Sequence, residues 1–160
     1  MSSLMIQSDE GFMREALRLA IKAREADEVP VGAVVVRKNQ IIARGYNQVE
    51  LLKDATAHAE MLALTAAEAA AGDWRLTECD LYVTKEPCPM CAGAIVHTRI
   101  RRVIFGCADV RTGAAGTVIN LLQHNSLNHQ CQITAGILEN QCAAILQDFF
   151  RKKRNPKSKI

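Results

Sequence analysis

The chain has 160 residues, 49% of them hydrophobic, and a formal net charge of +3, which suits one globular domain that can bury a core. No apolar run approaches the roughly 18 residues that a membrane-spanning helix needs, and the segment before Asp9 and Glu10 lacks the apolar stretch of a secretory signal. We therefore expect a single domain over residues 1–160, with its core at about 9–150, in the cytoplasm and without a membrane partner.

The hydrophobic pattern predicts helices that alternate with strands. Ser8 or Asp9 can cap the first helix, and Thr56 is the expected N-cap of the second, which places His58 in its first turn. In chain order we expect a helix over 9–26, strands over 31–36 and 40–44 joined by a hairpin turn, a loop over 46–56, a helix over 57–71, a strand over 81–84, a helix over 88–98, a strand over 102–106, a flexible turn at 113–116, a helix over 118–123, a strand over 132–134 and a helix over 138–153.

This order of elements predicts an α/β fold with three layers. About five strands form a central sheet, and helices cover both faces. The hairpin makes the sheet mixed, because its two strands run antiparallel. Ligands of such sheets bind at the carboxyl ends of strands, beside helix N-termini. His58 and Cys88 both fall near predicted helix starts, so the pattern places them in the same kind of position.

The positive charge is concentrated at the C-terminus. Residues 151–160 carry six basic side chains and no acidic one, whereas the first 150 residues carry 14 basic and 17 acidic side chains. We expect a polyanionic partner to meet this basic tail. The alternative is a solvated tail that only increases solubility.

Three side chains have the spacing of metal ligands. Cys88 and Cys91 are three residues apart at a predicted helix start, so both sulfurs can face one ion. His58 would be the third ligand, and three protein ligands leave the fourth position of a zinc ion open to water. Glu60 leaves the helix in a different direction from His58. Zinc lowers the pKa of water to about 7, and Glu60 is therefore the candidate catalytic residue that moves its proton.

Two other readings of the cysteine pair are open. A C-x-x-C segment also occurs in thioredoxin-like redox proteins. A closed structural zinc site would need a fourth ligand. His97 is poorly spaced for this role, because it lies six residues beyond Cys91 on the same helix, and His124 and His129 are candidates only if the chain folds back. The other cysteines are scattered singly, and we expect them to be buried, reduced thiols.

The two motifs, His58-Ala59-Glu60 and Pro87-Cys88-Pro89-Met90-Cys91, together form the signature of zinc-dependent nucleobase deaminases. Along nearly its whole length the chain resembles the bacterial tRNA-specific adenosine deaminases, the TadA family. Beyond the two motifs, the stretches that carry this resemblance are Val29–Val34, Gly45-Tyr46-Asn47, Leu81–Thr84, Phe105-Gly106, Thr112–Gly116, Asn128-His129 and Asp148–Arg151.

The resemblance implies a cytidine-deaminase-like fold and the hydrolytic deamination of adenosine to inosine. The implied target is the wobble position (34) of a tRNA anticodon, of the arginine tRNA type, recognised within the anticodon stem-loop. The implied assembly is a homodimer with one zinc ion per subunit. The target base would be flipped into the zinc pocket, which costs less in an anticodon loop because the loop is already single-stranded.

The resemblance also assigns substrate contacts. Asn47 is expected to contact the target nucleoside, and Asp109 its sugar or a flanking nucleotide. Phe149, Phe150 and Arg151 are expected to meet the loop and its phosphates. For the two phenylalanines, packing of the last helix against the core is an equal alternative.

The chain departs from the family pattern at three places, where Cys107-Ala108 removes a cation before Asp109, Asn125 replaces a common proline, and Lys85 replaces an apolar residue. Two competing functions remain open. One is deamination of a free base such as guanine or cytosine, which needs no basic tail. The other is a non-catalytic, zinc-stabilised RNA-binding module, which has no need of Glu60.

Overall fold

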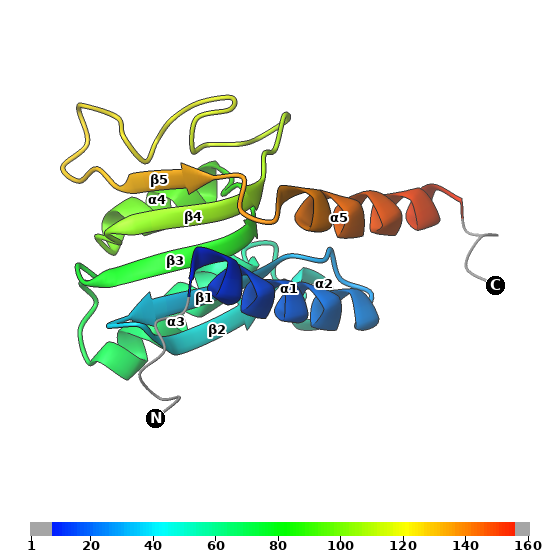
Figure 1. The fold of residues 1–160 in the computed structure, drawn as a ribbon, viewed down its shortest axis with the longest axis horizontal. Helices are drawn as coiled ribbons and strands as arrows, with labels where there is room; N and C mark the ends of the chain where they lie inside the picture. The colour runs from blue at the N-terminus through cyan, green and yellow to red at the C-terminus, as the bar shows by residue number, and fades with distance from the viewer. Residues whose placement is uncertain (1–7, 156–160) are drawn as a thin grey trace.

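Five strands form one mixed sheet that separates two helical layers (Figure 1). The computed structural model describes residues 8–155. In chain order its elements are α1 (Asp9–Glu25), β1 (Gly32–Arg37), β2 (Gln40–Tyr46), α2 (Val49–Leu52), α3 (Ala59–Ala71), β3 (Cys79–Lys85), α4 (Pro89–His97), β4 (Arg102–Cys107), β5 (Gln132–Ala135) and α5 (Glu139–Arg154).

The strands lie in the order β2-β1-β3-β4-β5. β1 pairs antiparallel with β2 and β3, whereas β3, β4 and β5 are parallel to one another. The three-layer α/β architecture with a mixed five-stranded sheet, expected from the sequence, is therefore confirmed. Residues of β1, β3 and β4 are buried almost throughout, because helices cover both faces of the sheet.

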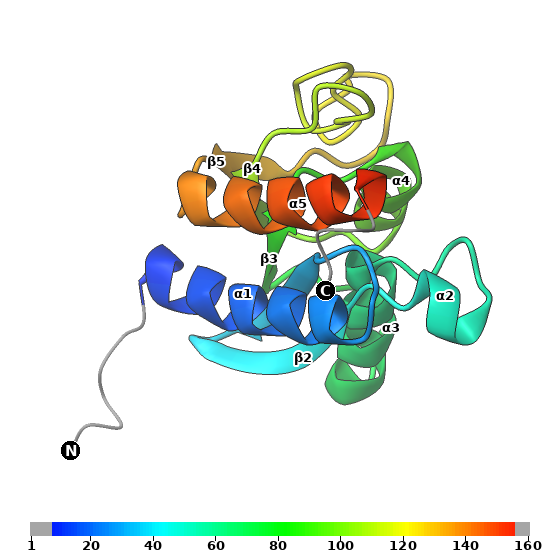
Figure 2. The same cartoon turned by 90° about the vertical axis from the view of Figure 1, so that its right-hand side faces the viewer.

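The helices α1 and α5 cover one face of the sheet, and α3 and α4 cover the other (Figure 1). Figure 2 shows α5 above α1 on their common side. Two glycines bring helices close to the sheet. A Cβ atom at Gly32 would lie 2.0 Å from the carbonyl oxygen of Ala16 in α1, and one at Gly45 would lie 2.5 Å from that of Ala59 in α3. Both helices thus rest directly on the strand backbone.

The start of the second long helix differs from the prediction. His58, with an extended backbone, is the N-cap of α3, and the helix begins at Ala59 rather than Ala57. The expected cap, Thr56, uses its backbone N–H and its hydroxyl to donate to the Asp54 carboxylate at 2.8 and 2.7 Å. These local bonds form a turn that ends before the helix.

Two further segments differ from the prediction. The expected loop over 46–56 contains a one-turn helix, α2. The expected helix over 118–123 does not form, and the segment consists of turns with a single bridge between Ala115 and Asn120. The Asn120 side chain accepts a hydrogen bond from the backbone N–H of Gln123, which competes with helical bonding.

The basic tail begins inside a helix. Residues 151–154 form the last turn of α5, where positive charge interacts favourably with the helix dipole. Lys157 and Lys159 lie outside the described residues. Between residues 8 and 155, the helices lack the combination of length and apolar character that a bilayer span requires. In the same range the cysteines other than Cys88 and Cys91 are buried and free of disulfides, as expected.

Candidate active site

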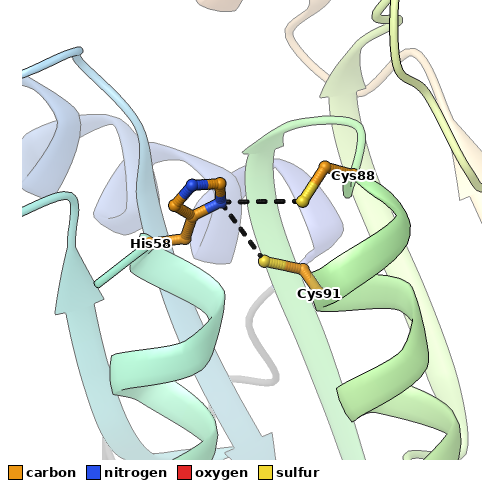
Figure 3. A group of neighbouring side chains, drawn as sticks. All are labelled: His58, Cys88 and Cys91. Carbon is orange, nitrogen blue, oxygen red and sulfur yellow. Dashed lines mark hydrogen bonds between the residues drawn. The ribbon is translucent and has the colours of Figure 1, made fainter. Parts of the chain in front are cut away.

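Three potential metal ligands meet where two helices begin on the same face of the sheet (Figure 3). His58 is the N-cap of α3, Cys88 is the N-cap of α4, and Cys91 lies in the first turn of α4. The Nδ1 atom of His58 lies 3.7 Å from Sγ of Cys88 and 3.5 Å from Sγ of Cys91. Pro89 is the first residue of α4, and Pro87 precedes the N-cap.

The donor set of this cluster suits zinc. The three ligand atoms all lie within 4.8 Å of one another and could hold a metal ion. A hydrogen bond between the two sulfurs lowers the pKa of Cys88 to about 4 and, together with burial, raises the pKa of Cys91. An imidazole nitrogen and two sulfurs from a C-x-x-C segment leave one tetrahedral position for a non-protein ligand.

Glu60 lies beside this cluster in the first turn of α3 and is only 4% exposed. Among residues 8–155, the atoms that converge on one point come from His58, Cys88 and Cys91, so Glu60 is not a member of the ligand set. Burial disfavours its charged form and raises the pKa of Glu60 to about 7. A carboxyl group with such a pKa can accept and donate a proton near neutral pH.

An open cavity of about 1050 Å³ lies over the cluster. Its wall includes His58, Glu60 and Cys88, and it is larger than a single nucleobase requires. The wall also includes four of the five residues expected to contact substrate: Asn47, Asp109, Phe149 and Phe150. Arg151 does not line it, and its exposed guanidinium is paired with Asp148 of the same helix.

Two of these wall residues, Asn47 and Phe149, are buried, whereas Phe150 is exposed. Asn47, which follows β2, is 7% exposed, and its backbone N–H donates to the carbonyl of Val31. Phe149 is 8% exposed and contacts Phe150 edge to face, with 5.4 Å between ring centroids. Phe150 is 40% exposed. Phe149 is thus both a packing residue and part of the wall, whereas Phe150 offers an accessible ring.

The Asp109 carboxylate is held by its own loop. Its Oδ1 accepts hydrogen bonds from the backbone N–H groups of Arg111 and Thr112, and its Oδ2 accepts one from the Thr112 hydroxyl. Lys85 forms an ion pair with Oδ2 at 3.0 Å. Burial opposes the charge, but these donors outweigh it and lower the pKa of Asp109 to about 2.

Two buried carboxylates on the wall were not predicted. Glu86, 2% exposed, accepts hydrogen bonds from the backbone N–H groups of Asp109, Ala115 and Thr117. Glu28, 1% exposed, accepts from the first N–H groups of α2 at 3.0 and 2.7 Å. Glu86 could have been singled out in the sequence by its position directly before the Pro-Cys segment. Nothing in the sequence singles out Glu28.

Comparisons with known proteins agree with this site. Residues 7–154 match the model of the MafB19-like deaminase family. The chain is 49% identical to the tRNA-specific adenosine deaminase of Bacillus subtilis (strain 168), over 93% of this chain and 92% of that protein.

Solved structures show the same fold. One, from a study of A-to-I editing by tRNA:A34 deaminases at the wobble position, has a TM-score of 0.82 and 43% identity, over 84% of this chain and 98% of that chain. A structure of the guanine deaminase from Nitrosomonas europaea has a TM-score of 0.79 but only 25% identity, over 91% and 86% of the two chains. The site, the fold and the extent of this similarity together show that the chain belongs to the tRNA-specific adenosine deaminase family.

Proposed function

We propose that this enzyme deaminates adenosine to inosine by zinc-dependent hydrolysis at the wobble position (34) of tRNA anticodons, of the arginine tRNA type. The observation that carries the proposal is the buried Glu60 beside the His58, Cys88 and Cys91 cluster at the base of a large cavity. We infer the substrate from the relatives, because the B. subtilis protein is a tRNA-specific adenosine deaminase. Identity to the guanine deaminase is much lower, so free-base deamination is the less favoured alternative.

Each site residue has a role in the proposed reaction. His58, Cys88 and Cys91 would hold one zinc ion per subunit, which when bound makes water a nucleophile at neutral pH. Glu60 accepts a proton from the attacking water and delivers it to a ring nitrogen of adenine, which makes the adjacent amidine carbon electrophilic. Water oxygen bonds to that carbon. Glu60 then takes the remaining proton from the hydroxyl on that carbon and delivers it to the amino group. The carbon–nitrogen bond breaks, ammonia leaves, and the oxygen remains as the carbonyl of inosine.

The cavity wall is proposed to bind the flipped nucleotide and the anticodon loop. Asn47 would contact the target nucleoside. Asp109 was expected to contact the sugar or a flanking nucleotide, but its oxygens are engaged by Arg111, Thr112 and Lys85, so its proposed role is to order the loop beside the nucleoside. The exposed ring of Phe150 is available for stacking with a base, with Phe149 behind it. Arg151 lies outside the cavity, at the basic end of α5, and is proposed to contact phosphates of the stem-loop.

The proposed setting follows from the substrate. A tRNA-modifying enzyme works where tRNA is used, so we infer a cytoplasmic location. We further infer a homodimer, from the resemblance to the tRNA-specific adenosine deaminases.

The experiment incubates the purified, zinc-loaded protein with an arginine tRNA transcript that carries adenosine at position 34. Free adenosine, cytosine and guanine serve as competing substrates. Inosine at position 34 of the tRNA, with the free compounds unchanged, is the expected result. Deamination of a free base in place of the tRNA would overturn the proposal.

A further inference from the structure

We propose that Lys85 is a substrate-contact residue, which binds a phosphate group next to the target nucleotide and so favours a polynucleotide over a free base. This inference rests on the proposed function. Lys85 is the last residue of β3, three residues before Cys88, and its side chain lines the same cavity as His58 and Glu60. It therefore places a positive charge on the wall beside the reaction centre.

The position of the Lys85 ammonium group is fixed by Asp109. The Nζ atom lies 3.0 Å from Oδ2 of Asp109, and the two side chains are 31% and 10% exposed. An ammonium group has three N–H donors, and Asp109 takes one of them. Within residues 8–155, Asp109 is the only residue with which Nζ of Lys85 forms an ion pair. Its other N–H donors therefore remain for a ligand in the cavity.

Asp109 itself has little capacity left for a ligand. Its two oxygens accept three hydrogen bonds from Arg111 and Thr112 in addition to the contact with Lys85. Glu86 holds the same loop by accepting from the Asp109 backbone N–H at 3.1 Å. The carboxylate of Asp109 is thus a support for the lysine, and the lysine is the group that can bind substrate.

The other charges on the wall favour this assignment. Glu28 and Glu86 direct their carboxylates at backbone N–H groups, and Lys153 pairs with Asp27 near the outer end of α5. Lys53, another cation on the wall, is exposed at the end of α2. Lys85, by contrast, is held by the loop that contains Asp109, on the wall that also includes His58 and Cys88. A free nucleobase carries no phosphate, so this cation would add affinity only for a nucleotide within a strand.

The experiment compares Lys85→Met, Lys85→Arg and Lys38→Met with the unsubstituted enzyme, all loaded with zinc. Lys38→Met is the matched control, because Lys38 lies on the exposed hairpin turn and does not line the cavity. The substrates are an anticodon stem-loop RNA with adenosine at the wobble position, and two versions in which the phosphate on one side of that adenosine is an uncharged methylphosphonate.

Lys85→Met is expected to raise KM for the natural stem-loop by about tenfold with little change in kcat. The slope of log(kcat/KM) against log salt concentration should become less steep by about 0.7. Lys85→Arg should largely restore both, and Lys38→Met should change neither. For the unsubstituted enzyme, KM for one of the two methylphosphonate substrates should be about tenfold higher than KM for the natural stem-loop. For Lys85→Met, KM for that substrate and KM for the natural stem-loop should be the same.

The outcomes separate the two proposals. Inosine formation with unchanged KM and salt dependence in Lys85→Met would overturn the role of Lys85 and leave the proposed function intact. A Lys85→Met enzyme that still responds to both methylphosphonates like the unsubstituted enzyme would show that Lys85 only positions Asp109. If a methylphosphonate has no effect on the unsubstituted enzyme on either side of the adenosine, the assignment is wrong whether or not the variants fold. Absence of inosine in the natural stem-loop would overturn both proposals.

Discussion

The carboxylate of Glu86 accepts a hydrogen bond at 3.1 Å from the backbone N–H of Asp109, 23 residues further along the chain. Glu86 directly precedes the Pro-Cys segment that leads into α4, and Asp109 lies in the loop that follows β4; both residues line the cavity. The bond therefore ties the strand that leads to two of the potential metal ligands to a loop that lines the cavity. Ala115 and Thr117 donate to the same carboxylate.

Glu86→Ala is expected to destabilise the protein strongly. The substitution leaves three buried or half-buried N–H groups without their acceptor, at about 1–3 kcal/mol each, so the free energy of unfolding should fall by at least about 3 kcal/mol. Urea unfolding of the zinc-loaded protein measures this. The exposed Glu78→Ala should change stability by no more than about 0.5 kcal/mol. Equal losses in the two variants would contradict the assigned role of Glu86.

Glu60→Gln should retain zinc and lose turnover. The amide keeps the size of the side chain but cannot accept and return a proton, and a positioned acid–base group contributes about 10²–10⁴-fold. Inosine formation and zinc content are measured on the same preparation. A variant that lost zinc and recovered full activity when the metal was resupplied would show that Glu60 is a structural support for the metal.

Removal of the metal should reduce both activity and stability. A chelator is expected to abolish inosine formation and lower Tm, and added zinc should reverse both effects. Zinc at 100 times its Kd should stabilise the fold by about 2.7 kcal/mol. In Cys91→Ala, which lacks one of three ligands, Tm should respond much less to the chelator. An equal response in that variant would place the stabilising metal elsewhere.

Asp109 should make stability depend on pH in the acid range. Burial opposes its charge, but hydrogen bonds from Arg111 and Thr112 and the contact with Lys85 outweigh burial, and its pKa in the folded chain is about 2. The unfolded value is about 3.9. The stabilisation is fully present above this unfolded value and is lost as the pH falls toward about 2, because the unfolded chain binds the proton first.

The measurement is the free energy of unfolding of the unsubstituted protein and of Asp109→Asn between pH 5 and pH 2. The difference between the two proteins should shrink as the pH falls. The difference for the exposed control Glu78→Gln is expected to change less. A constant difference for Asp109→Asn would show that the ionised carboxylate does not stabilise the fold.

The basic end of α5 should supply salt-dependent affinity for tRNA. Simultaneous replacement of Arg151, Lys152 and Arg154 by Gln keeps a helix-forming residue at each position and leaves the ion pair of Lys153 with Asp27 intact. Binding should weaken, and the salt dependence should become less steep by up to about 0.7 for each phosphate that the variant no longer neutralises. Deletion of residues 156–160 tests Lys157 and Lys159 separately. Unchanged binding in both would mean that the basic tail only aids solubility.

The sequence predicted a mixed sheet of about five strands and the cluster of potential ligands, because local patterns indicate both. Alternating apolar segments located the strands, and the spacing of Cys88 and Cys91 at a helix start brought two sulfurs to one side. His58 joins them because α3 and α4 begin on the same face of the sheet. That convergence follows from the alternation of strands and helices.

The buried carboxylates that hold the loops around the site could not be predicted in the same way. Glu28 and Glu86 have partners 22 to 31 residues away. Only its position directly before the Pro-Cys segment singles out Glu86, and nothing near Glu28 in the sequence distinguishes a buried carboxylate from an exposed one. The segment over 118–123 was misassigned because its apolar residues suited a helix, whereas Asn120 hydrogen-bonds to the local backbone. The contact between Lys85 and Asp109 likewise required the fold.

The geometry of the potential metal ligands depends on Gly45, a residue that has no functional group. The strand backbone at Gly45 touches the first turn of α3, where a Cβ atom would meet the Ala59 carbonyl at 2.5 Å and the Ala63 amide nitrogen at 2.8 Å. Any side chain there would displace the helix that begins directly after His58. A genetic screen for inactive enzymes should therefore recover substitutions of Gly45 as well as substitutions of the potential ligands. In a population selected for activity, substitutions should not accumulate at any of these positions.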